Sequence, residues 1–324
     1  MTNSFQQKRT IYFRYPSDKA YTFIEGDGDE QFAYRAFEDD YTNRIFGHKT
    51  PYKNLKLDVQ EGSHPSSMSR EDYSNAFKRI EQQFANGSLE KIILSRVIKS
   101  KIDTTNIESI FERLCELYPN AFVYLGDFGA EGMWGGATPE RLLSYENNIA
   151  STVALAGTKT TADPQAWTDK ERVEHRHVEQ FIVSLHDSSL SPLTNKSEVY
   201  LSRAGHLYHL KSDYEFEIDR THFEEFINRL HPTPAICGLP REASRKTILE
   251  IESHSRNLYT GFLGYVSNDP KERFELYVNL RCFQLRPNTL YTYVGGGITE
   301  SSIEENEWQE TVEKSKTIGR VFEN

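Results

Sequence analysis

The chain has little cysteine. Its three cysteines, Cys115, Cys237 and Cys282, lie far apart in the sequence. An odd number of cysteines without a C-x-x-C spacing indicates neither a disulfide framework nor a zinc site. The sequence therefore favours reduced and mostly buried thiols.

Long apolar runs are missing as well. No segment approaches the roughly 18 consecutive apolar residues that a membrane helix needs. Residues 1–16 are polar and charged, without the apolar centre of a signal peptide. We therefore expect a cytoplasmic protein that has no membrane partner.

The chain also lacks an excess of basic residues. Its 38 Lys and Arg stand against 48 Asp and Glu, which gives a formal net charge of −10. Nucleic acids and anionic membranes bind to clustered cations, so this charge argues against both. An anionic small molecule can still bind to an acidic protein where Arg, Lys, backbone N–H groups or a metal ion make the electrostatic potential of one cleft positive. We therefore expect a small ligand, in a chain of 324 residues that can bury a substantial core.

Regular structure is patterned unevenly along the chain. Residues 1–69 mix short aromatic strand-like pieces with polar connectors and carry no chemical signature, whereas the pattern of helices and strands is clearer over residues 70–324. Adjacent strands interspersed with helices predict a mixed α+β fold with antiparallel sheets. The expected helices are 71–86, 106–117, 169–186, 221–230, 241–252 and 303–321, and the expected strands include 91–98, 121–128, 141–145, 149–155, 260–266, 274–285 and 290–294.

Carboxylates stand on the apolar faces of two expected helices. Glu174 lies four residues before Val178 and therefore points toward an apolar stripe. Glu307, Glu310 and Lys314 continue the apolar stripe of the last helix. A solvated first helical turn and a surface Glu310–Lys314 pair are the simpler interpretations. Alternatively, acids from two helices supply the oxygen ligands that Mg²⁺ prefers.

Three consecutive glycines, Gly295, Gly296 and Gly297, follow the expected strand 290–294. A tight turn is the usual meaning of such a run, and close approach of backbone N–H groups to an anionic ligand is the functional alternative. The pattern G-x-x-x-x-G-K-[ST] is absent, so a nucleotide loop is not indicated.

A series of short motifs, read in order, resembles the chorismate-utilising enzymes, and most closely the isochorismate synthases among them. The motifs are Lys91-Ile-Ile-Leu-Ser-Arg96, Gly136-Ala-Thr-Pro-Glu140, Leu155-Ala-Gly-Thr158, Glu174-His175 with Val178, His231-Pro-Thr-Pro-Ala235, the Gly261/Gly264 pair, Arg281-Cys282, Gly295-Gly-Gly-Ile298 and Glu307-Trp-Gln-Glu-Thr311. The resemblance covers roughly residues 70–324. It implies a fold with central antiparallel sheets, helices outside and an active site in a cleft.

The resemblance also implies roles for individual residues. Lys91 resembles the base that activates water, and Glu140 the acid that protonates the departing hydroxyl of chorismate. Mg²⁺ would be held by Glu174 and Glu310 and, through water, by Glu307. The implied substrate contacts are Ala156, Gly157, Thr158, His231, Ala235, Ile236, Arg281, Gly295, Gly296, Gly297 and Lys314. For His231, capping of its helix remains the alternative.

Positions that differ within the family favour isochorismate as the product. Ala156 stands where one type of aminodeoxychorismate synthase carries a lysine nucleophile, and anthranilate synthases lack the lysine that Lys91 matches. Salicylate synthases, which also eliminate pyruvate, remain an alternative, and Ala235 in place of a bulkier Thr favours stopping at isochorismate. A non-catalytic chorismate-binding subunit is a further alternative. We expect no glutamine amidotransferase subunit and a monomer, and the product feeds menaquinone or siderophore synthesis.

Overall fold

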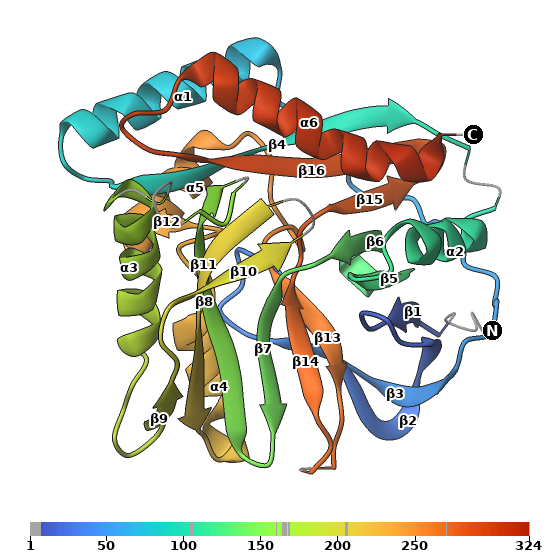
Figure 1. The fold of residues 1–324 in the computed structure, drawn as a ribbon. Helices are drawn as coiled ribbons and strands as arrows, with labels where there is room; N and C mark the ends of the chain where they lie inside the picture. Colours follow the sequence, from blue (N-terminus) through green and yellow to red (C-terminus); the bar gives the residue numbers. More distant parts are fainter. Residues whose placement is uncertain are drawn as a thin grey trace. The chain divides into compact units, whose positions relative to one another are not determined.

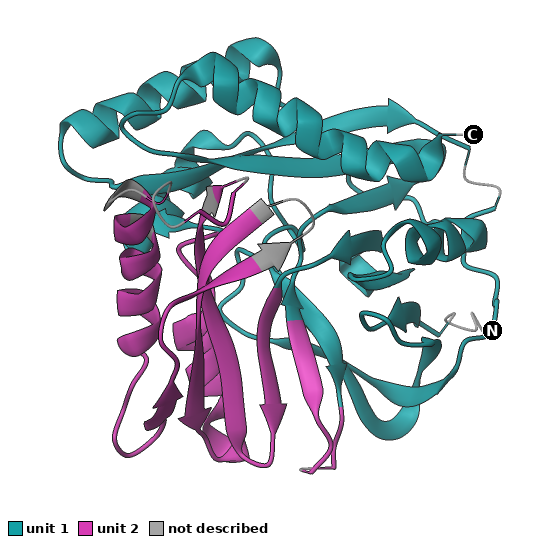
Figure 2. Cartoon of the chain, viewed as in Figure 1, with its two compact units in different colours: residues 1–140, 236–266, 277–324 teal, residues 141–235, 267–276 magenta. Residues whose placement is uncertain are grey.

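The computed structural model describes residues 8–103, 106–159, 161–163, 167, 169–204, 207–269 and 271–323. The chain divides into two compact units (Figure 2). Unit 1 comprises residues 1–140, 236–266 and 277–324, and unit 2 comprises residues 141–235 and 267–276. The boundary at residue 69 thus falls inside unit 1, and residues 70–324 contribute to both units. Among the described residues, no helix has the length and apolar character needed to cross a membrane.

Unit 1 contains an antiparallel sheet with the strand order β13-β2-β1-β5-β6-β15-β16-β4-β12 and with β3 paired to β2. Its strands are β1 (Thr10–Arg14), β2 (Ala20–Arg35), β3 (Asn43–Pro51), β4 (Lys91–Lys101), β5 (Phe122–Asp127), β6 (Met133–Thr138), β12 (Gly238–Leu239), β13 (Phe262–Val266), β15 (Cys282–Arg286) and β16 (Thr289–Ile298). Its helices are α1 (Arg70–Ala85), α2 (Glu108–Leu117), α5 (Arg241–Ile251) and α6 (Glu304–Phe322). Helix α6 lies along β16 (Figure 1).

Unit 2 contains the strand order β10-β11-β8-β7, with β9 paired to β11. Its elements are β7 (Arg141–Glu146), β8 (Ile149–Lys159), α3 (Asp169–Val183), β9 (Leu193–Lys196), β10 (Tyr200–Ala204), β11 (Leu207–Glu217) and α4 (Phe223–Leu230). Strand β14 (Phe274–Val278) begins in unit 2 and ends in unit 1, where it pairs with β13.

Local sequence explains how the elements around β4 form. Helix α1 begins with a capping box, in which Ser69 and Asp72 satisfy each other's backbone N–H groups. Its buried residues, among them Phe77 and Ile80, pack against Ile92 of β4 in one apolar cluster. Strand β4 is therefore buried by the helix that precedes it, as its β-branched run predicts.

The mixed α+β prediction is confirmed, and the strongly periodic elements appear near their expected bounds. The predicted hairpin of β7 and β8 forms through Asn147 and Asn148, which both have positive φ, 50° and 64°, as a two-residue type I′ turn requires. The expected strand 274–285 is wrong as a single element, because the chain breaks at residues 279–281 into β14 and β15. The expected helix 221–230 starts as a 3₁₀ turn capped by Asp219, and only Phe223–Leu230 is α-helical.

Candidate active site

Of the two interpretations of the three glycines, the tight turn is wrong. Gly295, Gly296 and Gly297 continue β16, and they pair with residues 93–95 of β4. A side chain on Gly295 would begin 2.8 Å from the Tyr259 hydroxyl oxygen. The prediction failed because glycine weakens a strand in isolation, whereas here a long ladder with β4 supplies the pairing. The missing side chains leave room for the charged groups that surround this segment.

Lys91 is the first residue of β4 and is partly buried. Its carbonyl oxygen accepts a hydrogen bond from Ser244 Oγ at 3.1 Å, which ties the start of the strand to α5. A Cβ on Gly297 would lie 3.3 Å from Lys91 Cε and 4.0 Å from Nζ. The Lys91 side chain therefore lies along the glycine segment. A larger residue at position 297 would crowd it.

Glu140 follows β6 and lies within the electrostatic reach of three cations. Burial raises the pKa of Glu140, and the positive charges of Lys91, Arg281 and Lys314 oppose this rise. The net shift is upward because the carboxylate loses more hydration free energy on burial than it gains from its attraction to these three cations. The structure thus brings Lys91 and Glu140 together, although 48 residues, from 92 to 139, separate them in the sequence.

Arg281 lies between β14 and β15, with its side chain exposed and its φ at +48°. Its carbonyl oxygen accepts a hydrogen bond from Ala137 N–H at 3.2 Å, so the residue is anchored beside the strand that leads to Glu140. A left-handed conformation costs a non-glycine residue roughly 1–3 kcal/mol, and such residues gather at binding sites. This conformation agrees with the binding role that the motif implies for Arg281.

Helix α6 carries Glu307, Glu310 and Lys314, as expected. The i, i+4 pair is formed, with Lys314 Nζ 2.6 Å from Glu310 Oε1, and the same nitrogen donates to Gly295 O at 2.9 Å. Burial, together with the neighbouring charge of Glu310, raises the pKa of Glu307. A Cβ on Gly296 would lie 3.5 Å from Glu307 Oε2 and 3.8 Å from Glu310 Oε1, so both carboxylates face the same glycine.

This pair of carboxylates fits one part of a magnesium site. Mg²⁺ prefers hard oxygen ligands and typically takes one or two protein carboxylates, with water and substrate completing its octahedron. Within the described part of the chain, no group of three or more His, Cys, Asp or Glu side chains is arranged for a metal. The third expected contributor, Glu174, lies in α3, but its side chain is outside the described residues.

The orientation of α6 is fixed by contacts around Trp308. The Arg96 guanidinium stacks 3.8 Å from the centre of the Trp308 ring, and Arg96 Nε donates to Thr311 Oγ1 at 2.7 Å. Arg70 of α1 lies over the same indole at 5.2 Å and pairs with Glu304. Stacked guanidinium groups on both α1 and β4 thus hold the helix turn that presents Glu307 and Glu310.

The remaining expected residues belong to unit 2, except Ile236, which is buried in unit 1. Gly157 has a φ of +71° next to a register shift between β8 and β11, so it is a glycine bulge. Ala156 is partly buried, Ala235 is exposed, and the side chain of Thr158 is outside the described residues. His231 is buried and forms the C-cap of α4, the alternative that its position in the sequence allowed.

The buried face of α3 differs from the expected stripe. Glu171 and His175 are buried in line with Ile182, whereas Val178 and Phe181 are only partly buried. His175 faces Ser212 and Glu179, and burial lowers the pKa of this imidazole. The apolar pattern missed this face because its first turns are occupied by polar residues that find partners inside unit 2.

Tyr259 is a candidate site residue that the sequence analysis did not identify. It is 4% exposed and stacks on Tyr293 at 5.7 Å. Burial raises the pKa of its hydroxyl, and Glu140 is among the acidic groups that add to the rise. Tyr259 thus lies between the glycine segment and Glu140. The nearest signal in the sequence was the Gly261/Gly264 motif, which begins two residues later, because no charge or periodicity marks Tyr259.

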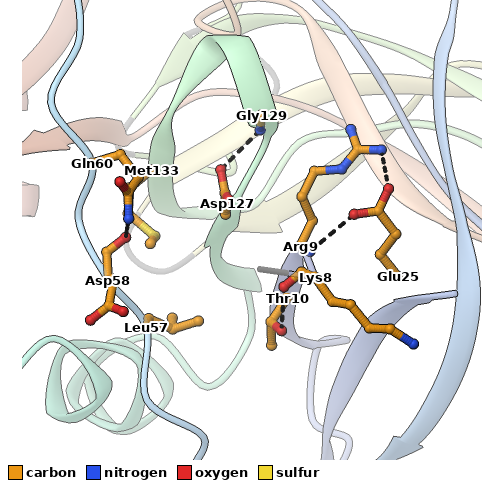
Figure 3. Close-up of a pocket in the computed structure, with 10 residues that line it drawn as sticks. All are labelled: Lys8, Arg9, Thr10, Glu25, Leu57, Asp58, Gln60, Asp127, Gly129 and Met133. Carbon is orange, nitrogen blue, oxygen red and sulfur yellow. Dashed lines mark hydrogen bonds and ion pairs between the residues drawn. The ribbon is translucent and has the colours of Figure 1, made fainter. Parts of the chain in front are cut away.

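A cavity of about 620 Å³ in unit 1 lies elsewhere, beside β1 and β5 (Figure 3). Charged side chains line it, but Arg9 pairs with Glu25 at 2.5 Å, and Asp127 accepts the N–H of Gly129 at 2.9 Å. None of its lining residues belongs to the candidate site. Its size therefore does not identify it as the place of the chemistry.

Comparisons with known proteins agree with this geometry. A family model described as chorismate binding enzyme matches residues 8–320. Isochorismate synthase EntC of Escherichia coli is 30% identical over 251 residues, which cover 74% of this chain and 63% of EntC, slightly under two thirds. Isochorismate synthase DhbC of Bacillus subtilis is 26% identical over 273 residues, 78% of this chain and 68% of DhbC.

The structure of MenF, the menaquinone-specific isochorismate synthase of Escherichia coli, superposes with a TM-score of 0.79. The superposition covers 99% of this chain and 90% of MenF at 19% sequence identity, so it demonstrates a common fold. The family match over nearly the whole chain, together with this fold, shows that the protein belongs to the chorismate-binding enzymes.

Proposed function

We propose that this protein is an isochorismate synthase, which isomerises chorismate to isochorismate with the help of Mg²⁺. The observation that carries the proposal is the placement of Lys91 beside the partly buried Glu140, whose pKa is raised by desolvation. The reaction adds a hydroxyl at C2 of the ring and removes one at C4 while the double bonds shift. It therefore requires a base for the incoming water and an acid for the leaving hydroxyl.

Lys91 and Glu140 supply these two roles. A general acid must be protonated at the working pH, and the raised pKa of Glu140 moves it in that direction. Lys91, partly buried at the glycine segment, accepts a proton from water when its amine is neutral. The two roles are opposite. Addition of water at C2 requires a group that takes up a proton, and departure of the hydroxyl from C4 requires a group that gives one.

The anionic groups of chorismate need positive partners in an acidic protein. Glu310 and Glu174 are the proposed protein ligands of Mg²⁺, and Glu307 orders its water. The metal ion would neutralise the ring carboxylate of the substrate. Arg281 and Lys314 bind the enolpyruvyl carboxylate. For Lys314 this requires its ammonium to turn from Glu310 toward the substrate, which is a short movement for a half-exposed side chain.

Several residues support isochorismate over other products of the family. Ala156 offers no nucleophile to the ring, and the presence of Lys91 supports attack by water rather than ammonia. Ala235 supports a reaction that ends before pyruvate is eliminated. A protein that uses water in this way needs no glutamine amidotransferase subunit, and we propose that it acts as a monomer in menaquinone or siderophore synthesis.

The direct test is incubation of the purified protein with chorismate and Mg²⁺, followed by chromatography of the products. Isochorismate alone supports the proposal. Salicylate with pyruvate would instead identify a salicylate synthase, and anthranilate formed with added ammonia would identify an amination reaction. Absence of turnover under all these conditions, with chorismate binding retained in calorimetry, would reduce the protein to a binding subunit.

A further inference from the structure

One short segment, residues 278–281, supports both Glu140 and Arg281. Val278 N–H donates to the Glu140 carbonyl at 2.9 Å. Thr138 Oγ1 donates to the Val278 carbonyl at 2.6 Å and accepts the Glu140 N–H at 3.3 Å. Arg281 ends the same segment. The backbone positions of the proposed acid and the proposed carboxylate-binding residue are therefore set by one piece of chain.

Asn279 occupies the centre of this segment and is completely buried. Its Nδ2 donates to the Leu258 carbonyl at 2.9 Å, and its Oδ1 accepts the Tyr124 hydroxyl at 2.8 Å. Its own N–H donates to the Gly261 carbonyl at 2.8 Å, and its carbonyl accepts the Thr260 N–H at 2.9 Å. Both ends of the side chain and both backbone groups are thus bound to neighbouring segments.

The segments that Asn279 joins are strained. Thr260 has a φ of +57° and Arg281 a φ of +48°. A left-handed conformation is a genuine outlier for a β-branched threonine, and it persists only where the surroundings enforce it. Asn279 hydrogen-bonds to residues on both sides of Thr260 and lies two residues before Arg281. Its contacts are therefore suited to hold both residues in these conformations.

We propose that Asn279 is a positioning residue of the active site, which fixes Arg281 and Glu140 at a set separation through its bonds to Tyr124 and Leu258. The inference rests on the proposed function, because only a substrate with a carboxylate and a leaving hydroxyl needs both groups together. The carboxyl group of Glu140 is also faced by Lys91 of β4, by Lys314 of α6 and by Tyr259. A shift of segment 278–281 changes all of these distances.

The test compares two variants with a matched control. Asn279→Ala removes both side-chain hydrogen bonds, and Tyr124→Phe removes only the hydrogen bond that the Tyr124 hydroxyl donates to Asn279 Oδ1. The control is Tyr145→Phe, because Tyr145 is equally buried and its hydroxyl bonds to Ile218 O at 2.9 Å and Asn148 Oδ1 at 3.1 Å within unit 2. The measurements are KM and kcat for chorismate, the pH profile of kcat, and the denaturation midpoint.

We expect KM to rise at least about tenfold in Asn279→Ala and about threefold in Tyr124→Phe, with the control within about twofold of the wild type. The alkaline limb of the kcat profile should move in Asn279→Ala only. In an Arg281→Ala background, Tyr124→Phe should raise KM no further, because residues that act through one another are not additive. A loss of stability that leaves the variant folded throughout the pH range of the assay changes neither KM nor the pH profile.

Lowered denaturation midpoints with wild-type KM and pH profile would overturn the inference and leave Asn279 with a structural role. If the wild type neither binds nor converts chorismate, the proposed function fails instead. Amide hydrogen exchange of residues 257–261 and 278–281 then decides the inference without substrate. Wild-type exchange rates in Asn279→Ala would refute it, and faster exchange confined to these residues would support it.

Discussion

Glu140 gives the proposed reaction a specific dependence on pH. A general acid works only when protonated, so kcat falls as the pH rises through its pKa, and a raised pKa extends the active range upward. We predict that Glu140→Gln lowers kcat by about 10²–10⁴ and removes this alkaline limb. The matched control is Glu131→Gln, since burial also raises the pKa of Glu131 outside the candidate site. An unchanged alkaline limb in Glu140→Gln would exclude Glu140 as the acid.

Substitution of Lys91 should slow the reaction without weakening the binding of chorismate. We predict that Lys91→Ala lowers kcat by about 10²–10⁴ while the dissociation constant for chorismate, measured by calorimetry, changes little. We expect binding to survive, because the proposed carboxylate contacts, Arg281, Lys314 and the metal ligands, are unchanged in this variant. Lys101→Ala, an exposed lysine at the far end of the same strand, is the control. A large loss of affinity with kcat retained would reassign Lys91 to substrate binding.

The sequence pointed to Lys91 and Glu140 as candidates, but it did not predict the residues around them. Motif order pointed to Lys91 and Glu140, and the structure shows them close enough to interact. The sequence did not indicate Tyr259 and Asn279, because their contacts are with residues far away along the chain. A neutral side chain that bonds to loops far along the chain leaves no local pattern in the sequence.

At the scale of the elements, the link between α5 and β4 depends on a buried ion pair. Glu252, just after α5, binds Arg256 through contacts of 2.6 and 2.8 Å, and both side chains are at most 2% exposed. Glu252 Oε1 also accepts the N–H of Ser95, and Arg256 Nη2 donates to the carbonyl of Ile93. The pair therefore fixes the strand that begins with Lys91.

We predict that Glu252→Gln lowers the free energy of unfolding by about 3–5 kcal/mol, because it leaves the Arg256 charge buried without a partner. Burial opposes ionisation of Glu252, but the charge and hydrogen bonds of Arg256 outweigh it and lower the pKa. A carboxyl group with a lowered pKa stabilises the fold above its unfolded pKa, and this stability disappears as the pH falls through the folded value. Urea titrations at neutral and acidic pH should show that acidification lowers the free energy of unfolding less in Glu252→Gln than in the wild type. Equal decreases would contradict the prediction.

Helices were easier to predict than strands in this chain. The sequence of helix α1 contains a capping box and apolar residues at helical spacing. Strand β6, Met133–Thr138, contains two glycines and no alternation of apolar and polar residues. Gly135 lies against Phe283 of β15 and Leu125 of β5, so a larger residue would collide there. Strand β6 is thus specified by its neighbours on both sides, which the local sequence does not contain.

At the scale of the whole molecule, turnover should depend on a divalent cation. We predict that Glu310→Ala abolishes activity and Mg²⁺ binding in calorimetry, because it removes a proposed ligand from α6. Glu313→Ala is the matched control, since Glu313 lies on the same helix and pairs with Lys316. Substantial turnover by Glu310→Ala at saturating Mg²⁺ would refute the ligand assignment.

The β4–β16 ladder joins residues 92–101 to residues 289–298 without a break. Such distant pairing carries a large loop-closure entropy, and it forms slowly compared with local structure. During synthesis, β4 leaves the ribosome long before its partner β16 exists, and only α1 and the earlier segments are present to cover its apolar residues. The glycine segment lies next to Lys91, Tyr259 and the α6 carboxylates, so these groups come together only after β16 has paired with β4. A nascent chain can therefore assemble the candidate site only after β16 and the first turns of α6 have been synthesised.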